Sequence, residues 1–537
     1  MNTIRTRFNK LTAARKNHDS QWEDIAMYVL PGKADFITQR TEGDRARGKA
    51  IFDPTAAVSM NVLSSHMHTS LTSPSAPWFE LKFQDPEVNK DDTAKEWIQD
   101  CTKRMYNAIN DSNFVSIINE TYKDLITFGT ACIEATFINT PETGFKLVFK
   151  SIPLQTCVFT ESVHGSVDTV YVECNMTPSQ AKELFGEEKL PDQIKDLLEQ
   201  GKLEPKKFLR CVEPNGQYKL RSKKKDEREF KSTWLFGDEM ISEDGFYELP
   251  FMVPRWDKIT GESYGFGPGN LAYPDIKTIN EAKRLELRSW EKAIDPPMMG
   301  MAGGVLGDLN LQAGGYTQVR DTRALAPLHD QANWQAVQIK SQELRQNIQA
   351  VFLIDQLILP ERPNATATEV TIRYEMMQKV LGGTLGRLQS ELLNPLVNRV
   401  FGIMARNGQL EEAPDNLESG DYEVKYTGPM AKAQTANEAM AIERMYNLLM
   451  GVGQMDPTVM DAVDLPKSIL AVAAQWGVPA DVLRSEDEIA DIQEQRAKAQ
   501  QQQQAQENAM QQAQIGQEQA AAETANVEAM RNVAGVY

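Results

Sequence analysis

The strongest constraint on the fold is a pair of helical segments separated by a glycine-rich stretch. Residues 276–294 are periodic and highly charged, and this helix must end at Asp295-Pro296-Pro297 because proline cannot continue the helical ladder. Residues 298–328 hold six glycines without a helical period, so we expect turns and short strands there. The second helix carries a heptad stripe, formed by Trp334, Val337, Ser341, Leu344, Ile348 and Val351. A single apolar stripe of this kind packs against one neighbouring surface, so we expect the two helices to form an elongated column.

The first 270 residues mix helical and strand patterns. Residues 93–128 are typical of two helices, and residues 206–251 are typical of hairpins. Four further strand candidates are rich in β-branched and aromatic residues: 131–137, 145–149, 156–159 and 167–174. An α+β domain accounts for this mixture. Residues 1–50 are polar with one apolar helical patch, which predicts a peripheral helix followed by an exposed loop.

The chain after residue 270 is mostly helical. A loop with two prolines occupies residues 359–364, and Thr366 with Glu369 then forms a capping box that begins the longest helical pattern of the chain, reaching toward Gly408. Gly382, Gly383, Gly386 and Pro395 lie inside that pattern. Because glycine and proline are both unfavourable within a helix, we expect a kink or break there.

The acidity of the chain is concentrated at its C-terminal end. Residues 409–537 hold 8 basic and 21 acidic side chains, a net charge of −13 out of −18 for the whole chain. The last 40 residues are dominated by Gln, Ala and Glu. A helix that is polar on all sides gains little from its own fold. This segment is therefore either disordered or packed side by side with identical copies through its alanines.

Charge and hydropathy exclude several classes of protein. A net charge of −18 argues against a protein that holds nucleic acid by neutralising phosphates, although DNA could still pass such a surface without sticking. No run approaches the ~18 apolar residues of a spanning helix, so we expect no membrane partner. The basic N-terminus lacks the apolar segment of a secretory signal, which favours a soluble chain that is intracellular at synthesis.

The sequence offers little for catalysis. It has no phosphate-binding loop of the Gly-x4-Gly-Lys kind, and the motif Gly265-Phe-Gly267-Pro-Gly269 lacks the strand-to-helix frame of a dinucleotide site. The five cysteines are scattered, which is typical of buried structural thiols. We therefore expect no enzyme, no cofactor and no metal site. Residues 219–231 carry seven basic side chains against three acids, which is typical of a solvated hairpin or, alternatively, of a docking face.

Four stretches of the sequence, each weak alone, are informative as an ordered set. They are Leu71-Thr-Ser-Pro-Ser-Ala-Pro-Trp-Phe79; Arg255-Trp-Asp-Lys-Ile-Thr-Gly-Glu-Ser-Tyr-Gly-Phe-Gly-Pro268 with Pro274-Asp-Ile-Lys-Thr-Ile-Asn280; Thr366-Ala-Thr-Glu-Val370; and Gly477-Val-Pro with Leu483-Arg-Ser-Glu486. In these stretches and in their order, the chain resembles the portal, or head-to-tail connector, proteins of short-tailed double-stranded DNA bacteriophages. The glycine-rich stretch between the helices is not matched residue by residue.

The resemblance implies a mainly α fold with α+β portions, in a portal-type subunit that forms a ring, typically of twelve copies, around a DNA channel. The implied regions are a wing-like α+β region with N-terminal helices at 1–270, a first stem helix at 271–295, a clip at 296–330, a second stem helix at 331–353, a channel loop at 354–366, a long kinked helix at 367–408, crown helices at 409–484, and a glutamine-rich barrel helix or tail at 485–537. The ring would lie in the virion, at the portal vertex, after assembly in the host cytoplasm.

The implied partners are further copies of the chain, the DNA in the channel, capsid and scaffolding proteins, a terminase motor and then a tail adaptor protein. The channel loop would consist of Leu359, Pro360, Glu361, Arg362, Pro363 and Asn364. Arg362 and Glu361 would approach the DNA or, alternatively, pair with a neighbouring subunit. Arg320, Asp321 and Arg323 are candidates for docking at the clip, although solvated turn charges are the simpler explanation of them. Competing hypotheses are another ring-forming tail adaptor and a metal-dependent nucleic-acid enzyme.

Overall fold

The elements described below belong to one compact unit of the chain. The computed structural model describes residues 2–38, 48–75, 77–85, 88, 91–141, 144–219, 222, 224–306, 308, 310, 317–321, 323, 325–327, 334–357, 382–414, 422–426, 445–446 and scattered positions within 492–527. The chain divides into two units, Met1–Ala431 and Lys432–Tyr537. The predicted channel loop at 359–364 and the capping box at Thr366 lie outside the described residues, and the predicted tail is described only at isolated positions. Within the region 409–484, where crown helices are expected, the structure describes 409–414, a strand at Tyr422–Tyr426 and 445–446.

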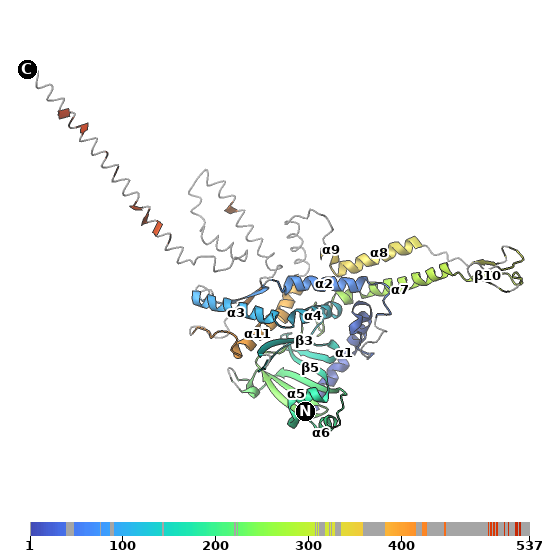
Figure 1. The fold of residues 1–537 in the computed structure, drawn as a ribbon, viewed down its shortest axis with the longest axis horizontal. Helices are drawn as coiled ribbons and strands as arrows, with labels where there is room; N and C mark the ends of the chain where they lie inside the picture. The colour runs from blue at the N-terminus through green and yellow to red at the C-terminus, as the bar shows by residue number, and fades with distance from the viewer. Residues whose placement is uncertain are drawn as a thin grey trace, which may run out of the picture. The chain divides into compact units, whose positions relative to one another are not determined.

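The first unit combines helices with antiparallel sheets (Figure 1). The α-helices are α1 (Asn2–Val29), α2 (Thr55–Leu71), α3 (Asp92–Asn110), α4 (Phe114–Phe128), α5 (Pro178–Phe185), α6 (Asp192–Glu199), α7 (Pro268–Ile294), α8 (Trp334–Val351), α9 (Ile354–Leu357) and α11 (Asn394–Arg406). The strands are β1 (Phe79–Phe83), β2 (Ile133–Thr140), β3 (Gly144–Ser151), β4 (Cys157–Glu161), β5 (Val167–Met176), β6 (Lys206–Pro214), β7 (Phe230–Phe236), β8 (Glu239–Phe246), β9 (Phe251–Met252), β10 (Met298–Gly300), β11 (Leu325–Pro327) and β12 (Tyr422–Tyr426).

The largest sheet is an antiparallel meander of the five strands β4 to β8 in chain order. A second sheet has the order β3-β2-β9, and β1 pairs with β12, with Phe79 opposite Tyr426. The predicted strands at 131–137, 145–149, 156–159 and 167–174 correspond to β2 to β5, and the two helices expected at 93–128 are α3 and α4. The prediction of a mixed helix and sheet fold is therefore confirmed for the described residues.

The main core lies between the helices and the sheet of β2 and β3. It joins α2, α3, α4, the first half of α7, the second half of α8, and α11. The apolar patch predicted near the N-terminus is the buried face of α1, and many other positions of this helix are exposed. Trp22, Ile25 and Ala26 are fully buried, and the Trp22 indole N–H donates to the Phe128 carbonyl at 3.1 Å. Arg15 is buried on the same helix and donates to the carbonyls of Leu154 and Gln155.

The helix around Pro395 departs from regular α geometry. A π-helical turn at Gln389–Leu393 lies between residues 382–388 and α11, and the Asn394 N–H bonds the Gln389 carbonyl five residues back. Pro395 has no N–H, and its ring would clash with the carbonyl four residues earlier in an α-helix. The wider turn relieves that clash, so the α-helical ladder is interrupted inside the segment where the sequence predicts a kink or break.

Candidate functional site

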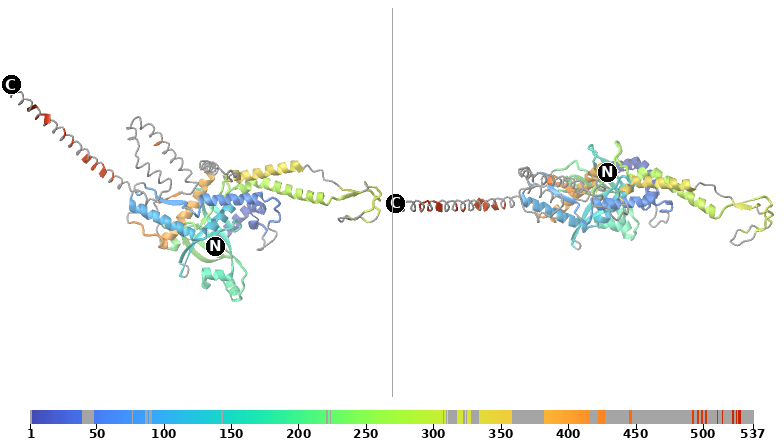
Figure 2. Two further views of the ribbon diagram at one scale, coloured as in Figure 1. Left: turned by 45° about the horizontal axis from the view of Figure 1, so that its top comes forward. Right: turned by 90° about the horizontal axis from the view of Figure 1, so that it is seen from above.

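The predicted stem helices form a two-helix arm, which we define as α7 and α8 with the hairpin that joins them. Both views of Figure 2 show α7 and α8 side by side, with the hairpin beyond their far ends. The root half of the arm packs into the main core through Ile276 and Ile279 on α7 and Leu344 and Ile348 on α8. The heptad seam is thus confirmed for its described buried members, which also include Ser341.

Polar contacts fix the root of the arm to the loop before α2. The Asn280 side chain accepts from the Phe52 N–H at 2.7 Å and donates to the Ala50 carbonyl at 2.8 Å. Arg345 donates to Asp53 Oδ2 at 2.8 and 3.0 Å. Burial alone would raise the pKa of Asp53, but hydrogen bonds from Thr55 and Arg345 lower it. Asp53 therefore links the start of α2 to α8.

The motif Gly265-Phe-Gly267-Pro-Gly269 is a close crossing of two backbone segments. A Cβ atom added to Gly265 would lie 2.2 Å from the carbonyl oxygen of Gly129, and one added to Gly269 would lie 2.4 Å from that of Thr127. Gly129 itself has φ +75°, a conformation that favours glycine. The glycines therefore let the chain pass the end of α4 before α7 begins, which explains the motif without a nucleotide.

Arg255 joins the start of this crossing to the π-helical turn. Its side chain is 1% exposed, and its Nη2 and Nε donate to the Glu391 carboxylate at 2.6 and 3.1 Å. It also pairs with Glu161, and Lys258 Nζ lies 2.6 Å from Oε1 of the same Glu161 carboxylate. Burial would raise the pKa of Glu161, but hydrogen bonds from Lys258 and Arg255 lower it. The sequence did not predict this cluster of ion pairs, because nothing near Arg255 in the chain indicates that Glu161 and Glu391 are its partners.

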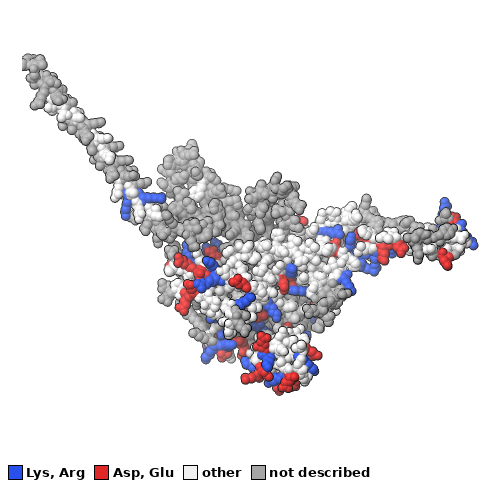
Figure 3. All heavy atoms as spheres, viewed as in Figure 1, with Lys and Arg blue, Asp and Glu red and all other residues white. Residues whose placement is uncertain are grey.

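Among the described residues of the distal half of the arm, no large apolar side chain is buried. The buried positions of α7 end at Glu286, and beyond it Leu287, Trp290 and Ile294 are 42%, 48% and 84% exposed. On α8, Ile339 is 70% exposed. Figure 3 shows acidic and basic side chains intermixed along this part of the molecule. Large apolar side chains in water on adjoining elements mark a surface for protein contact.

The hairpin at the far end of the arm holds the three predicted docking residues. β10 and β11 pair with Met299 opposite Ala326, as expected for short strands in the glycine-rich stretch. Arg320, Asp321 and Arg323 are exposed there, with the Arg320 N–H bonded to the Gly304 carbonyl at 2.9 Å and the Arg323 N–H to Asp321 Oδ1 at 2.9 Å. The structure thus places these three residues together at one tip. The loop residues Leu359 to Asn364 are not described.

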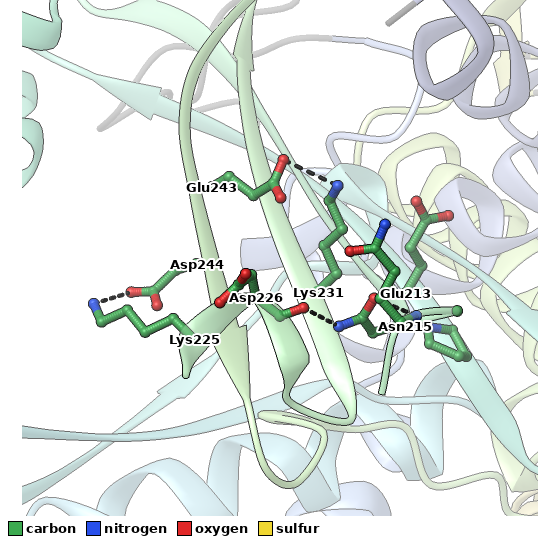
Figure 4. Close-up of a pocket in the computed structure, with 10 residues that line it drawn as sticks. Glu213, Asn215, Lys225, Asp226, Lys231, Glu243 and Asp244 are labelled. Atoms are coloured by element: carbon green, nitrogen blue, oxygen red, sulfur yellow. Dashed lines mark hydrogen bonds and ion pairs between the residues drawn. The ribbon is translucent and has the colours of Figure 1, made fainter. Parts of the chain in front are cut away.

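The basic segment 219–231 lies beside a surface pocket of about 380 Å³ (Figure 4). The two lysines that line the pocket are paired, Lys225 with Asp244 at 3.2 Å and Lys231 with Glu243 at 3.0 Å. Glu213 and Asp226 also line the pocket. Because acids outnumber lysines and the lysines already have partners, this pocket is poorly suited to phosphate. The segment fits the interpretation as a solvated hairpin.

Other chemistry is sparse in the part of the chain that the structure describes. No cluster of His, Cys, Asp and Glu there could hold a metal ion. Four of the five cysteines are buried, and burial raises the pKa of Cys101 and of Cys211 to about 12, which keeps both thiols protonated. Among the described helices, none is long and apolar enough to cross a membrane.

Comparisons with known proteins agree with one another. Residues 1–483 match the family described as bacteriophage head to tail connecting protein. The portal protein of Salmonella phage epsilon15 is 28% identical over 502 residues, covering 91% of this chain and 90% of that protein. The probable portal protein of Bordetella phage BPP-1 is 26% identical over 510 residues, covering 92% and 91% of the two chains. These matches run through the arm and its hairpin.

Proposed function

This chain belongs to the bacteriophage head to tail connecting protein family, and on that premise we propose that it forms a ring, typically of twelve copies, at one capsid vertex. The ring surrounds the channel through which the genome is packaged and later ejected. It hydrolyses no ATP itself, because a terminase motor drives the DNA. Its partners are capsid and scaffolding proteins, the motor, and then a tail adaptor protein, within the virion.

The observation that carries this proposal is the exposure of large apolar side chains on the distal half of the arm. Leu287, Trp290 and Ile294 on α7 and Ile339 on α8 gain nothing from exposure to water, whereas burial of such a side chain contributes about 1.5–3 kcal/mol. Two helices that expose unlike faces suit a heterologous contact, in which one face of each subunit meets another face of the next and the ring closes. The arm is therefore proposed to line up with its copies around the axis.

Electron microscopy of the purified protein in negative stain tests the ring. End-on views should show annular particles with a central hole, and their symmetry gives the subunit number. Trp290→Glu should shift the protein toward smaller species. Leu203→Glu is the control and should not, because Leu203 is 72% exposed and lies outside the arm. Solitary wild-type particles at every salt and magnesium concentration would contradict the proposal.

We propose that residues Leu359 to Asn364 are the channel loop and that Glu361 and Arg362 approach passing DNA. The support is the sequence pattern and the family match, since the loop lies outside the described residues. Arg362→Glu should alter packaged genome length or DNA retention, because a glutamate repels the DNA phosphates. At physiological salt this repulsion acts over a screening length of ~8 Å. Lys103→Glu, the same change on the exposed face of α3, is the control. Unchanged packaging and retention would count against a role in DNA contact.

A further inference from the structure

The N-terminal half of α1 is basic in a chain that is acidic as a whole. Residues 1–18 hold five basic side chains and no acid, whereas the net charge of the chain is −18. Arg15 is buried and pairs with Asp19 at 2.7 Å. The other four basic side chains reach the surface, and we call them the basic face of α1: Arg5, Arg7, Lys10 and Lys16.

The opposite side of α1 anchors the helix to the body of the protein. Phe8 packs on Tyr171 of β5 with ring centroids 6.3 Å apart, in a hydrophobic cluster that also contains Val158 and Leu209. Figure 1 shows α1 beside the sheet to which β5 belongs. Because this contact fixes the rotation of the helix about its axis, it also fixes which side chains point into solvent.

The basic side chains lie in two rows along this surface. With 3.6 residues per turn, Arg5 and Lys16 follow one edge of the exposed side of α1, and Arg7 and Lys10 follow the other. About 16 Å of helix (11 × 1.5 Å) separates Arg5 from Lys16. The exposed positions between the rows carry small side chains, namely Asn9, Ala13 and Asn17. A long anionic molecule can therefore approach the helix closely and meet positive charge on both sides.

Most charges of the basic face are available to a ligand. No described residue forms an ion pair or a hydrogen bond with the side chain of Arg5, Lys10 or Lys16. Arg7 pairs with Glu213 at 2.7 Å, and its side chain is still 45% exposed. The basic segment 219–231 differs, because three of its lysines are already paired with acids. Three unpaired positive charges on one helix face therefore mark α1 as the better anion-binding surface.

The other side chains of this surface favour a nucleic acid over a protein as the anion. No large apolar side chain of α1 is exposed among the residues that the structure describes. Protein interfaces are anchored by buried aromatic and apolar side chains, which this surface lacks. Nucleic-acid phosphates and sugars are contacted by Lys and Arg together with Asn, Gln, Ser and Thr. Side chains of the second kind are exposed beside the basic rows: Thr3, Asn9, Asn17, Ser20 and Gln21.

The net negative charge of the chain does not oppose this interpretation. Of the total of −18, a net −13 belongs to residues 409–537. At physiological salt a charge acts strongly only within ~8 Å. The charges next to the ligand therefore decide binding at α1, and those are positive.

We propose that the basic face of α1 binds the phosphate backbone of double-stranded DNA, on residues that belong to neither the arm nor the predicted channel loop. The choice of duplex DNA rests on the proposed function, which brings this protein next to the genome. The binding is independent of base sequence, because backbone contacts carry no sequence information. It gives the DNA a second, reversible and salt-sensitive contact with the protein in addition to its passage through the channel.

Fluorescence anisotropy of a labelled DNA duplex, titrated with the purified full-length protein, tests the site. Release of counterions by three unpaired basic side chains predicts a slope of about −2.7 (0.9 × 3) for log K against log salt, so affinity should fall roughly 40-fold between 50 and 200 mM salt. Lys10→Gln with Lys16→Gln leaves one such side chain. This double variant should bind at least tenfold more weakly at 50 mM salt, with a slope of about −0.9.

Lys95→Gln with Lys103→Gln is the matched control, with the same change in net charge on α3. Both lysines are exposed, and residues 92–110 hold three acids and three basic side chains, so no local excess of positive charge is lost there. This control should bind duplex within about twofold of the wild type. Because all four lysines are exposed, both double variants should keep the wild-type melting temperature.

Three results would overturn the proposal. The first is no binding of duplex by the wild type at 50 mM salt, and the second is an equal loss of binding in both double variants. The third is binding of polyglutamate as tight as that of duplex at equal charge concentration, which would show an acidic protein as the partner. The proposed function fails separately: a wild type that forms no rings but binds duplex through α1 refutes the ring alone, whereas rings whose α1 variant binds duplex normally refute this site alone.

Discussion

Alanine at position 265 should be among the most damaging single-methyl changes in this chain. The new Cβ would lie 2.2 Å from the Gly129 carbonyl oxygen, and ordinary contacts begin at 3.4 Å, so the two backbone segments must separate by about 1.2 Å (3.4 − 2.2). Two hydrogen bonds hold this crossing together, from the Gly265 N–H to Thr130 Oγ1 at 2.8 Å and from the Trp256 N–H to the Gly129 carbonyl at 2.9 Å. Stretched by that amount, both exceed hydrogen-bonding distance.

The cost follows from these contacts. Each buried group left without a partner costs about 1–3 kcal/mol, and overpacking itself costs about 1–3 kcal/mol, so with two bonds broken Gly265→Ala should destabilise the fold by at least about 3 kcal/mol. Urea unfolding followed by tryptophan fluorescence should show a midpoint lowered by roughly 1 M. Gly216→Ala, where a Cβ meets nothing within 4 Å, is the matched control. A Gly265→Ala midpoint equal to that of the wild type would refute the steric argument.

Three further changes probe other parts of the unit. Arg255→Met should cost about 3–5 kcal/mol in the same unfolding assay, because it leaves the Glu391 carboxylate without its charged partner, and a smaller loss than for an exposed ion pair would contradict that role. Asp53→Asn should lower stability at pH 7 by about 1–2 kcal/mol. Because the folded pKa of Asp53 is depressed, its contribution to stability is present above the unfolded pKa and lost as pH falls through the folded value. Wild type and variant should therefore converge in stability once the pH is below the folded pKa, and a constant difference across pH would exclude the ion pair. Ile348→Ala should cost about 2–5 kcal/mol in thermal unfolding and Ile339→Ala little, since they are 0% and 70% exposed, and equal effects would show the seam placed wrongly.

Some features of the candidate site could be predicted from local sequence, and others depend on contacts between distant residues. The arm was predictable, because the heptad stripe, the Asp295-Pro296-Pro297 stop and the glycine-rich stretch each act within a few residues. The exposure of Leu287, Trp290 and Ile294 on the arm was not predictable, because nothing local distinguishes exposed from buried apolar residues. Whether the channel loop and the docking charges act as proposed stays a prediction.

Several features had no local signal. The pairing of β1 with β12, the contact of Arg255 with Glu391, and the hydrogen bonds of Arg15 join residues far apart in the chain. Burial of Arg15 had no local signal because a buried arginine is acceptable only when specific carbonyls accept its hydrogen bonds, and those carbonyls lie on another element.

By itself the sequence determined where most of the described helices and strands lie and where the arm turns back. It also determined the net negative charge of the chain. These properties come from side-chain periodicity, proline geometry and net charge, which need no knowledge of neighbours in space. Only the tertiary structure decided which glycines permit a crossing, which arginine is a buried tie, and which apolar side chains remain in water. Each of those depends on how separate faces pack, a result of the whole chain's energy rather than of any segment.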